Sequence, residues 1–224
     1  MPPTPESIYA APAEWVARGA GAQGNLFLTG RAGTGKMTLL RKFLAEAGDK
    51  AVIVAPTGVA AMNAGGQTIH SFFKLPPRLI EPQDVRRLPN ARVVRAVDTV
   101  VIDEISMVRA DMLDAIDRSL KLNRGSKRPF GGVRMILSGD LHQLPPVISS
   151  QEGPILQERF GGGYFFNAPA FRDGEFSLLA LKHVFRQEDP RFLALLGALR
   201  TGRVTPNDEA TLARVHGAGY PPAI

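Results

Sequence analysis

Short runs of apolar residues recur along the chain, and each is followed by a glycine, a proline or an acid. The runs are Asn25–Thr29, Ala51–Ala55, Thr99–Ile102 and Arg134–Ser138. Their apolar residues are consecutive rather than alternating with polar ones, which is typical of strands in a parallel sheet that is covered on both faces. The pattern therefore predicts a buried, mostly parallel sheet.

The residues between these runs show helical spacing. A first helix is predicted over residues 36–47, where apolar side chains recur three or four positions apart and Gly48 follows. A second is predicted between the last two strands, and a third over residues 190–201, with Asp189 as its N-cap and Pro190 at its first position. The alternation of strands and helices predicts the α/β class, with helices on both faces of the sheet.

Composition excludes several classes of protein. The chain has 224 residues, enough for one full domain and a small appendage. It contains no cysteine, which excludes a disulfide framework, a thiolate metal site and a cysteine nucleophile. No window of about 18 residues is continuously apolar, so we expect no membrane span and no membrane partner. The first six residues include three prolines and no basic residue, so we expect no secretory leader.

The basic residues are concentrated in two segments. The net charge of +6 favours a polyanionic partner. Residues 118–134 hold six basic residues and no acid, and residues 74–95 hold six basic residues and two acids. Such runs are more often solvated faces than binding surfaces. The stretch from Pro76 to Pro89 is the best candidate for an insertion that projects from the sheet.

A glycine-rich stretch follows the first predicted strand and leads into the first helix. Its sequence is Gly-Arg-Ala-Gly-Thr-Gly-Lys, residues 30–36, in the context that a phosphate-binding loop requires. Glycines let the backbone turn tightly, so that N–H groups and the helix N-terminus face a phosphate. A merely structural turn is the alternative. The predicted nucleotide-binding residues are Gly30, Ala32, Gly33, Thr34, Gly35, Lys36, Met37 and Thr38.

One position of this loop departs from the usual pattern. The residue after Lys36 is ordinarily Ser or Thr, whose hydroxyl binds Mg²⁺, but here it is Met37. A thioether is a poor ligand for a hard cation. Thr38 comes one residue later, where its hydroxyl should point elsewhere on the helix. Either other groups bind Mg²⁺ or hydrolysis is impaired.

Polar residues follow two further predicted strands. Asp103 and Glu104 come directly after the third strand, where phosphate-loop enzymes hold Mg²⁺ and activate water. A capping pair at the next helix is the alternative for these acids. Gln143 follows the fourth strand and could orient the water, although by itself it would more often be a surface glutamine. The carboxyl ends of parallel strands share one edge, so these groups should lie together.

Four stretches together resemble the PIF-type (petite integration frequency) DNA helicases of the RecD-like branch of superfamily one. They are Gly30–Lys36, Ala55–Phe73, Val101–Met107 and Lys127–Val147. Val184–Gln187 is similar to the family's next motif, whose arginine, here Arg186, reaches the γ-phosphate. The resemblance covers roughly residues 25–204.

The resemblance implies a RecA-like phosphate-loop NTPase domain over residues 25–204. Residues 1–24 would be an N-terminal helix or lead-in, and residues 205–224 a remnant leading to a second RecA-like domain in the parent chain. ATP and Mg²⁺ are the implied cofactors. The implied catalytic residues are Lys36 and Arg186 on phosphate, Asp103 on Mg²⁺, Glu104 on the attacking water, and Gln143 coupling nucleotide state to DNA binding.

The resemblance also implies contacts with single-stranded DNA and with duplex/single-strand junctions. The expected DNA-binding residues are Pro56, Thr57, Gly58, Thr68, His70, Phe72, Lys127 and Arg128. His70 taken alone would more often be a core histidine, and at least one of Phe72 and Phe73 should be core. The insertion at about residues 74–95 would occupy the place of a strand-separating pin.

The leading hypothesis is thus an ATP-dependent DNA helicase motor domain that moves five-prime to three-prime. The alternative is a nucleotide- and DNA-binding module without motor activity, given Met37 and the missing second domain. A generic phosphate-loop kinase is a weaker third hypothesis, because it does not explain the Gln-Leu-Pro-Pro sequence at residue 143. The family's settings would be DNA repair, DNA recombination and telomere maintenance. We expect a monomer in the bacterial cytoplasm (nucleoid), or in the nucleus or mitochondrion of a eukaryote.

Overall fold

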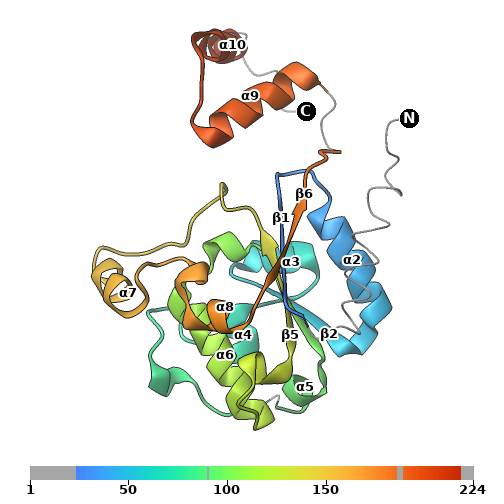
Figure 1. Ribbon diagram of the computed structural model, residues 1–224, viewed down its shortest axis with the longest axis vertical. Helices are drawn as coiled ribbons and strands as arrows, with labels where there is room; N and C mark the ends of the chain where they lie inside the picture. Colours follow the sequence, from blue (N-terminus) through green and yellow to red (C-terminus); the bar gives the residue numbers. More distant parts are fainter. Residues whose placement is uncertain (1–23, 90, 186–188, 218–224) are drawn as a thin grey trace. The chain divides into compact units, whose positions relative to one another are not determined.

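The structure is a computed structural model that describes residues 24–89, 91–185 and 189–217. The chain divides into two compact units, one ending at Lys182 and the other beginning at His183 (Figure 1). Among the described residues no helix is both long enough and apolar enough to span a bilayer. The sequence predicts a domain that continues to residue 204; that bound stays a prediction, and the last strand of the sheet ends at Leu181.

The first unit is built on a six-stranded sheet in the order β3-β2-β4-β5-β1-β6. Every neighbouring pair of strands is parallel, which confirms the predicted α/β class. The carboxyl ends of all six strands therefore lie at one edge. The strands are β1 (Leu26–Gly30), β2 (Ala51–Ala55), β3 (Gln67–Thr68), β4 (Thr99–Ile102), β5 (Arg134–Gly139) and β6 (Ser177–Leu181).

Helices connect the strands and cover the sheet (Figure 1). In the first unit they are α2 (Lys36–Ala47), α3 (Gly58–Ala64), α4 (Ile69–Phe73), α5 (Ala91–Ala96), α6 (Ala110–Arg124), α7 (Glu152–Phe160) and α8 (Pro169–Asp173). Short 3₁₀ helices span Gly48–Lys50, Pro82–Asp84, Ile105–Met107, Pro129–Gly132 and Phe165–Asn167. The second unit contains α9 (Pro190–Thr201) and α10 (Pro206–Gly217), and the Asp189 side chain caps α9 as predicted.

Two apolar clusters form the core, one on each face of the sheet. In β1, Leu26 and Leu28 belong to one cluster, together with residues of α2, while Phe27 between them belongs to the other. The second cluster is the larger and includes the apolar residues of α6. Because successive side chains of a strand point to opposite faces, consecutive apolar residues are what a sheet covered on both sides requires.

The segment between α4 and α5 does not project from the sheet, contrary to the prediction for Pro76–Pro89. Its side chains Leu75, Ile80 and Leu88 are all at most 6% exposed. The backbone N–H of Ile80 donates to Asp111 at 2.8 Å, and that of Leu88 donates to Asn123 at 2.8 Å, both on α6. The segment therefore lies along α6. Its prolines prevent a long helix or strand, but the segment still packs against the core.

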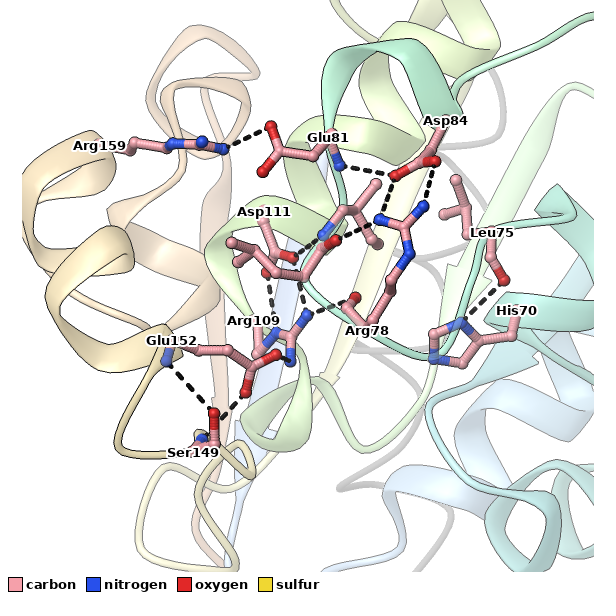
Figure 2. A network of polar contacts seen from close by, with 12 residues as sticks. His70, Leu75, Arg78, Glu81, Asp84, Arg109, Asp111, Ser149, Glu152 and Arg159 are labelled. Atoms are coloured by element: carbon pink, nitrogen blue, oxygen red, sulfur yellow. Dashed lines mark hydrogen bonds and ion pairs between the residues drawn. The ribbon is translucent and has the colours of Figure 1, made fainter.

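A network centred on Arg109 fixes this segment and the start of α7 (Figure 2). The guanidinium of Arg109 donates two hydrogen bonds to Asp111, one to Glu152 and one to the carbonyl of Arg78, all between 2.8 and 3.0 Å. Arg159 of α7 forms an ion pair with Glu81 at 2.9 Å. The side chains of Arg109 and Asp111 are 12% and 1% exposed, so this pair is largely shielded from water.

Replacing Asp111 with Ala should destabilise the first unit by about 3 kcal/mol, because the shielded Arg109 guanidinium loses two of its four hydrogen bonds and the Ile80 N–H loses its acceptor. Arg78→Ala is the matched control: it breaks the ion pair with Asp84, in which the Arg78 side chain is 58% exposed. The control should lower stability much less, since exposed ion pairs contribute little. Urea unfolding followed by circular dichroism measures both variants, and equal losses would contradict the role given to Asp111.

Candidate nucleotide and nucleic-acid site

The glycine-rich loop joins the end of β1 to the start of α2. Gly33 and Gly35 have φ values of 77° and 82°, in the left-handed region that favours glycine. Gly35 is the N-cap of α2, and no side chain caps this helix end. A side chain at Gly30 would come within 2.7 Å of the Leu181 carbonyl and the Thr34 hydroxyl. The loop therefore keeps the backbone compact and turns the first N–H groups of α2 toward the carboxyl edge of the sheet.

Lys36 closes the loop. Its ammonium donates to the carbonyls of Gly30 at 2.7 Å and Arg31 at 3.2 Å. The Thr34 hydroxyl also donates to the Arg31 carbonyl, at 2.8 Å. Burial raises the pKa of Asp103 and of Glu104, and the nearby positive charge of Lys36 offsets part of that rise in both acids. One cation thus faces both the loop and the carboxylates, as a phosphate site requires.

Met37 has a packing role in this structure. Its side chain is partly buried against the apolar cluster formed by β1 and α2. Thr38 is exposed. The position that usually carries a Ser or Thr hydroxyl therefore holds a thioether that packs against the apolar cluster.

Asp103 and Glu104 lie where β4 ends. Asp103 is 8% exposed, and burial raises its pKa; the nearby Ser138 hydroxyl, the Glu104 backbone and Lys36 offset part of this shift. Ser138 Oγ is itself buried and does not meet hydrogen-bond geometry with any partner in the described part of the chain. Burial and then the charge of Asp103 raise the pKa of Glu104. Glu104 also adopts φ 52°, a strained conformation for a residue other than glycine, and such strain is common at functional sites.

The loop after β5 begins with a buried acid. Asp140 is 3% exposed, and its carboxylate accepts the N–H of His142 at 3.1 Å. Its carbonyl accepts the N–H of Gln143 at 2.9 Å, which forms a turn. Gln143 is exposed, as are Leu144 and Val147, at 68% and 81%. The turn presents Gln143 to solvent at the edge that holds the glycine-rich loop. Sequence analysis assigned no role to Asp140 or Ser138, although both stand in the stretch that resembles the family.

The residues expected to touch DNA separate into three groups, the first of which lies toward the carboxyl edge of the sheet. Thr57 and Thr68 cap α3 and α4, accepting the N–H groups of Ala60 at 3.2 Å and Ser71 at 3.1 Å. Each hydroxyl keeps its O–H as a donor. Nδ1 of His70 bonds to the Leu75 carbonyl at 3.2 Å, which leaves Nε2 for an outside partner. These groups, with Pro56 and Gly58, follow β2 or β3 and so lie toward the carboxyl edge.

Phe72 cannot stack on a base in this structure. It is 4% exposed and packs edge to face on Phe73, whose ring centroid is 4.9 Å away. Both rings belong to the larger core cluster. The expectation that Phe72 contacts DNA is therefore corrected, whereas the expectation that at least one of the two is core is confirmed.

Lys127 and Arg128 are exposed but belong to the opposite edge. They precede β5, whereas the glycine-rich loop, Glu104 and Gln143 follow their strands. Arg124, from the same basic run, is structural: it donates to four backbone carbonyls. Arg186 lies outside the described residues, as do residues 1–23 of the expected lead-in.

Comparison with known proteins matches residues 6–209 to the PIF1-like helicase family. The chain belongs to the PIF1-like helicase family. It is 36% identical over 195 residues to ATP-dependent DNA helicase PIF1 of Emericella nidulans, a match that covers 81% of this chain and 25% of that protein. It is 37% identical over 192 residues to the PIF1 helicase of Mus musculus, covering 84% and 28%.

Solved structures of Pif1 helicases are also similar to this chain. Bacteroides Pif1 bound to single-stranded DNA is similar with a TM-score of 0.82 and 39% identity, covering 90% of this chain and 49% of that chain. Pif1 helicase from Bacteroides in complex with ADP-AlF3 and single-stranded DNA gives the same TM-score and identity, covering 93% and 48%. This chain thus spans about half of those solved chains and about a quarter of the curated relatives, and its fold is that of the first RecA-like motor domain.

Replacing Met37 with Ser should raise the contribution of Mg²⁺ to nucleotide affinity by about tenfold, because the hydroxyl adds an oxygen ligand. Affinity in EDTA should change less than about twofold, since the loop amides and Lys36 are unaltered. Titration with a fluorescent ATP analogue, with and without Mg²⁺, gives both values. Glu46→Gln, at an exposed position in the last turn of α2, is the control and should change neither. An unchanged Mg²⁺ dependence in Met37→Ser would show that the metal does not approach this position.

Proposed function

We propose that this chain is the ATP-binding and ATP-hydrolysing motor domain of a DNA helicase that moves five-prime to three-prime along single-stranded DNA. The observation that carries the proposal is the convergence at one sheet edge of the glycine-rich loop with Lys36, the acids after β4 and Gln143 after β5. Bacteroides Pif1, which shares 39% identity, is the relative solved with both ADP-AlF3 and single-stranded DNA.

Each side chain at this edge has its own role in binding or hydrolysing ATP. Lys36 and the N–H groups of the loop bind the phosphates of ATP. Glu104, whose pKa is raised by burial and by Asp103, accepts the proton of the attacking water. Gln143 senses the γ-phosphate and passes nucleotide state to the DNA-binding residues. Arg186 is proposed as a second cation on the γ-phosphate.

The donors at this edge fit Mg²⁺ bound together with a nucleotide. The described residues contain no group of three or more His, Cys, Asp or Glu side chains that would hold a metal by themselves. Mg²⁺ is usually held by one or two carboxylates, phosphate oxygens and waters, and Asp103 would be such a carboxylate. When bound, the ion would neutralise charge that develops on the transferred phosphoryl group.

The proposed DNA partners are single strands and duplex/single-strand junctions. Thr57, Thr68 and His70 would contact the strand from the carboxyl edge. A second RecA-like domain in the parent chain would complete the ATP cleft. The parent protein would act in DNA repair, recombination or telomere maintenance.

Met37 favours a second candidate function, a nucleotide- and DNA-binding module without motor activity. The Met37 side chain packs, partly buried, against the apolar cluster of β1 and α2 and offers no oxygen to a metal. Binding would then be retained, whereas hydrolysis would be negligible even after the second domain is supplied.

Lys36→Ala should weaken binding of a fluorescent ATP analogue at least tenfold, because it removes the cation of the loop. Glu104→Gln should leave that affinity within about threefold but lower single-turnover hydrolysis by about 100-fold. Enzyme in excess over ATP makes slow turnover measurable in these 224 residues, which span about half of the solved relatives. Glu46→Gln, at an exposed position on α2, is the control. Binding that survives Lys36→Ala would refute the site, and wild-type binding without hydrolysis, even with the second domain, would favour the non-motor module.

His70→Ala should reduce affinity for single-stranded DNA about tenfold, the effect of losing one good hydrogen bond to a charged group. Fluorescence anisotropy of a labelled oligothymidine measures the change. The matched control is Ser71→Ala, an exposed neighbour on the same helix. If the two variants bind alike, His70 serves only to bond the Leu75 carbonyl.

A further inference from the structure

The amino edge of the sheet carries basic residues that the proposed function does not use. Residues 86–97 lead into β4 and residues 122–133 lead into β5, and neither segment contains an acid. Because the strands are parallel, both segments lie at the edge opposite the glycine-rich loop. Figure 1 shows α5 and the end of α6 together at the lower end of the first unit.

The last turn of α6 holds the two segments together. Asn123 accepts the N–H of Leu88 at 2.8 Å and donates to the carbonyl of Arg86 at 3.3 Å. The guanidinium of Arg124 donates to the carbonyls of Val94, Arg95, Val97 and Gly131, at 2.6 to 3.1 Å. The backbone on both sides of α6 is therefore fixed, and its exposed side chains are presented as one surface.

These side chains form what we call the amino-edge basic surface. Its members are Arg86, Arg87, Arg92, Arg95, Lys127 and Arg128, and all six are exposed. Arg124 lies behind them. Its four hydrogen bonds to backbone carbonyls do not neutralise the positive charge of its guanidinium, because a carbonyl carries no net charge. Arg134, at the start of β5, is 8% exposed; burial lowers its pKa to about 10, so it is still charged at neutral pH.

The acids near this surface are already paired. Asp98 lies 3.8 Å from Lys50, and Asp117 lies 2.7 Å from Lys121. Asp84 forms an ion pair with Arg78 at 2.7 Å. The hydrogen bond from Arg78 lowers the pKa of Asp84, and the charge of Arg86 contributes to the same shift. Each of these three acids thus lies within ion-pair distance of a cation that does not belong to the amino-edge basic surface.

We propose that the amino-edge basic surface binds the phosphate backbone of duplex DNA, at a site separate from the nucleotide edge. The proposal rests on the proposed function only in taking DNA as the polyanion. β4 and β5 have four and six residues, so the two edges are roughly 13–20 Å apart at about 3.3 Å per residue. A duplex on this surface would leave the carboxyl edge open to a single strand, which suits a protein acting at a junction.

The chemistry of the surface favours a duplex over a single strand. Single-strand sites combine cations with aromatic rings that stack on bases. Among the described residues of the two segments, the exposed large apolar side chains are Val93 and Leu122, at 44% and 38%, and the one aromatic residue, Phe130, is fully buried. A duplex also carries a charge about every 1.7 Å, twice the density of one strand. Binding should therefore be independent of sequence and steeply salt-dependent.

The test uses the whole 224-residue chain and compares two triple variants, each of which removes three positive charges. One is Arg86→Ala, Arg87→Ala and Lys127→Ala; the other is Lys42→Ala, Arg191→Ala and Arg203→Ala, exposed cations of α2 and the second unit. The probe is a blunt labelled duplex, titrated at several salt concentrations. The first variant should lose at least about tenfold in affinity, and its salt slope should fall by roughly 2–3, at about 0.9 per phosphate contact. The second should change the slope by less than about one.

Other outcomes would overturn the proposal. Equal losses in both variants would mean that only net charge matters, and no loss would return the surface to a solvated face. Binding to phosphatidylserine vesicles but not to the duplex would assign the surface to membranes. Nucleotide affinity and oligothymidine affinity, measured on the same samples, should be unchanged in the first variant. If the wild type binds neither of them, the proposed function fails independently of the duplex result.

Discussion

The parallel direction of the six strands is the constraint on which the site depends. Adjacent strands β4, β5 and β1 are in register, with Ile102 beside Leu137 and Thr29 beside Gly139. The residues that follow these strands are therefore neighbours although they are far apart in sequence. A parallel sheet must be covered on both faces, and the two apolar clusters meet that requirement. The same rule that makes the strands apolar thus gathers Lys36, Asp103 and Gln143 at one edge.

Helix α6 is the second organising element, and it acts through buried polar side chains. Asp111, Asp117 and Asn123 accept the backbone N–H groups of Ile80, Phe130 and Leu88, at 2.7 to 2.8 Å. Irregular segments cannot satisfy their own buried N–H groups, so such acceptors let them pack against the core. One helix thereby fixes the segment before α5, the lead into β5 and, through Arg109, the start of α7.

The sequence predicted the parts of the fold that depend on local pattern. The four apolar runs became β1, β2, β4 and β5, and the glycine-rich loop stands where its motif requires. β6 was not predicted. It is an edge strand and is partly exposed, with Leu178 66% exposed, so burial does not mark it as a strand. β3 has only two residues and no pattern to find. Hydropathy also could not show that one buried carboxylate and one amide of α6 would bind the segment Pro76–Pro89, because residue type alone places Asp and Asn on the surface.

Charge was the least reliable guide, because one residue type serves opposite purposes. Arg124 and Lys127 lie in the same basic run, yet one guanidinium joins four carbonyls while the other cation is exposed. Only hydrogen-bond partners distinguish the two.

Met37 shows how separable the parts of such a site are. Phosphate binding by the loop comes from backbone N–H groups and Lys36, which do not need a hydroxyl at the next position. The acids come from β4, which a side chain on α2 does not position. Met37 instead adds apolar contact to the cluster beneath the loop. Met37 therefore contributes packing where the usual Ser or Thr would contribute an oxygen ligand, so nucleotide binding and turnover should respond separately to a change at this position.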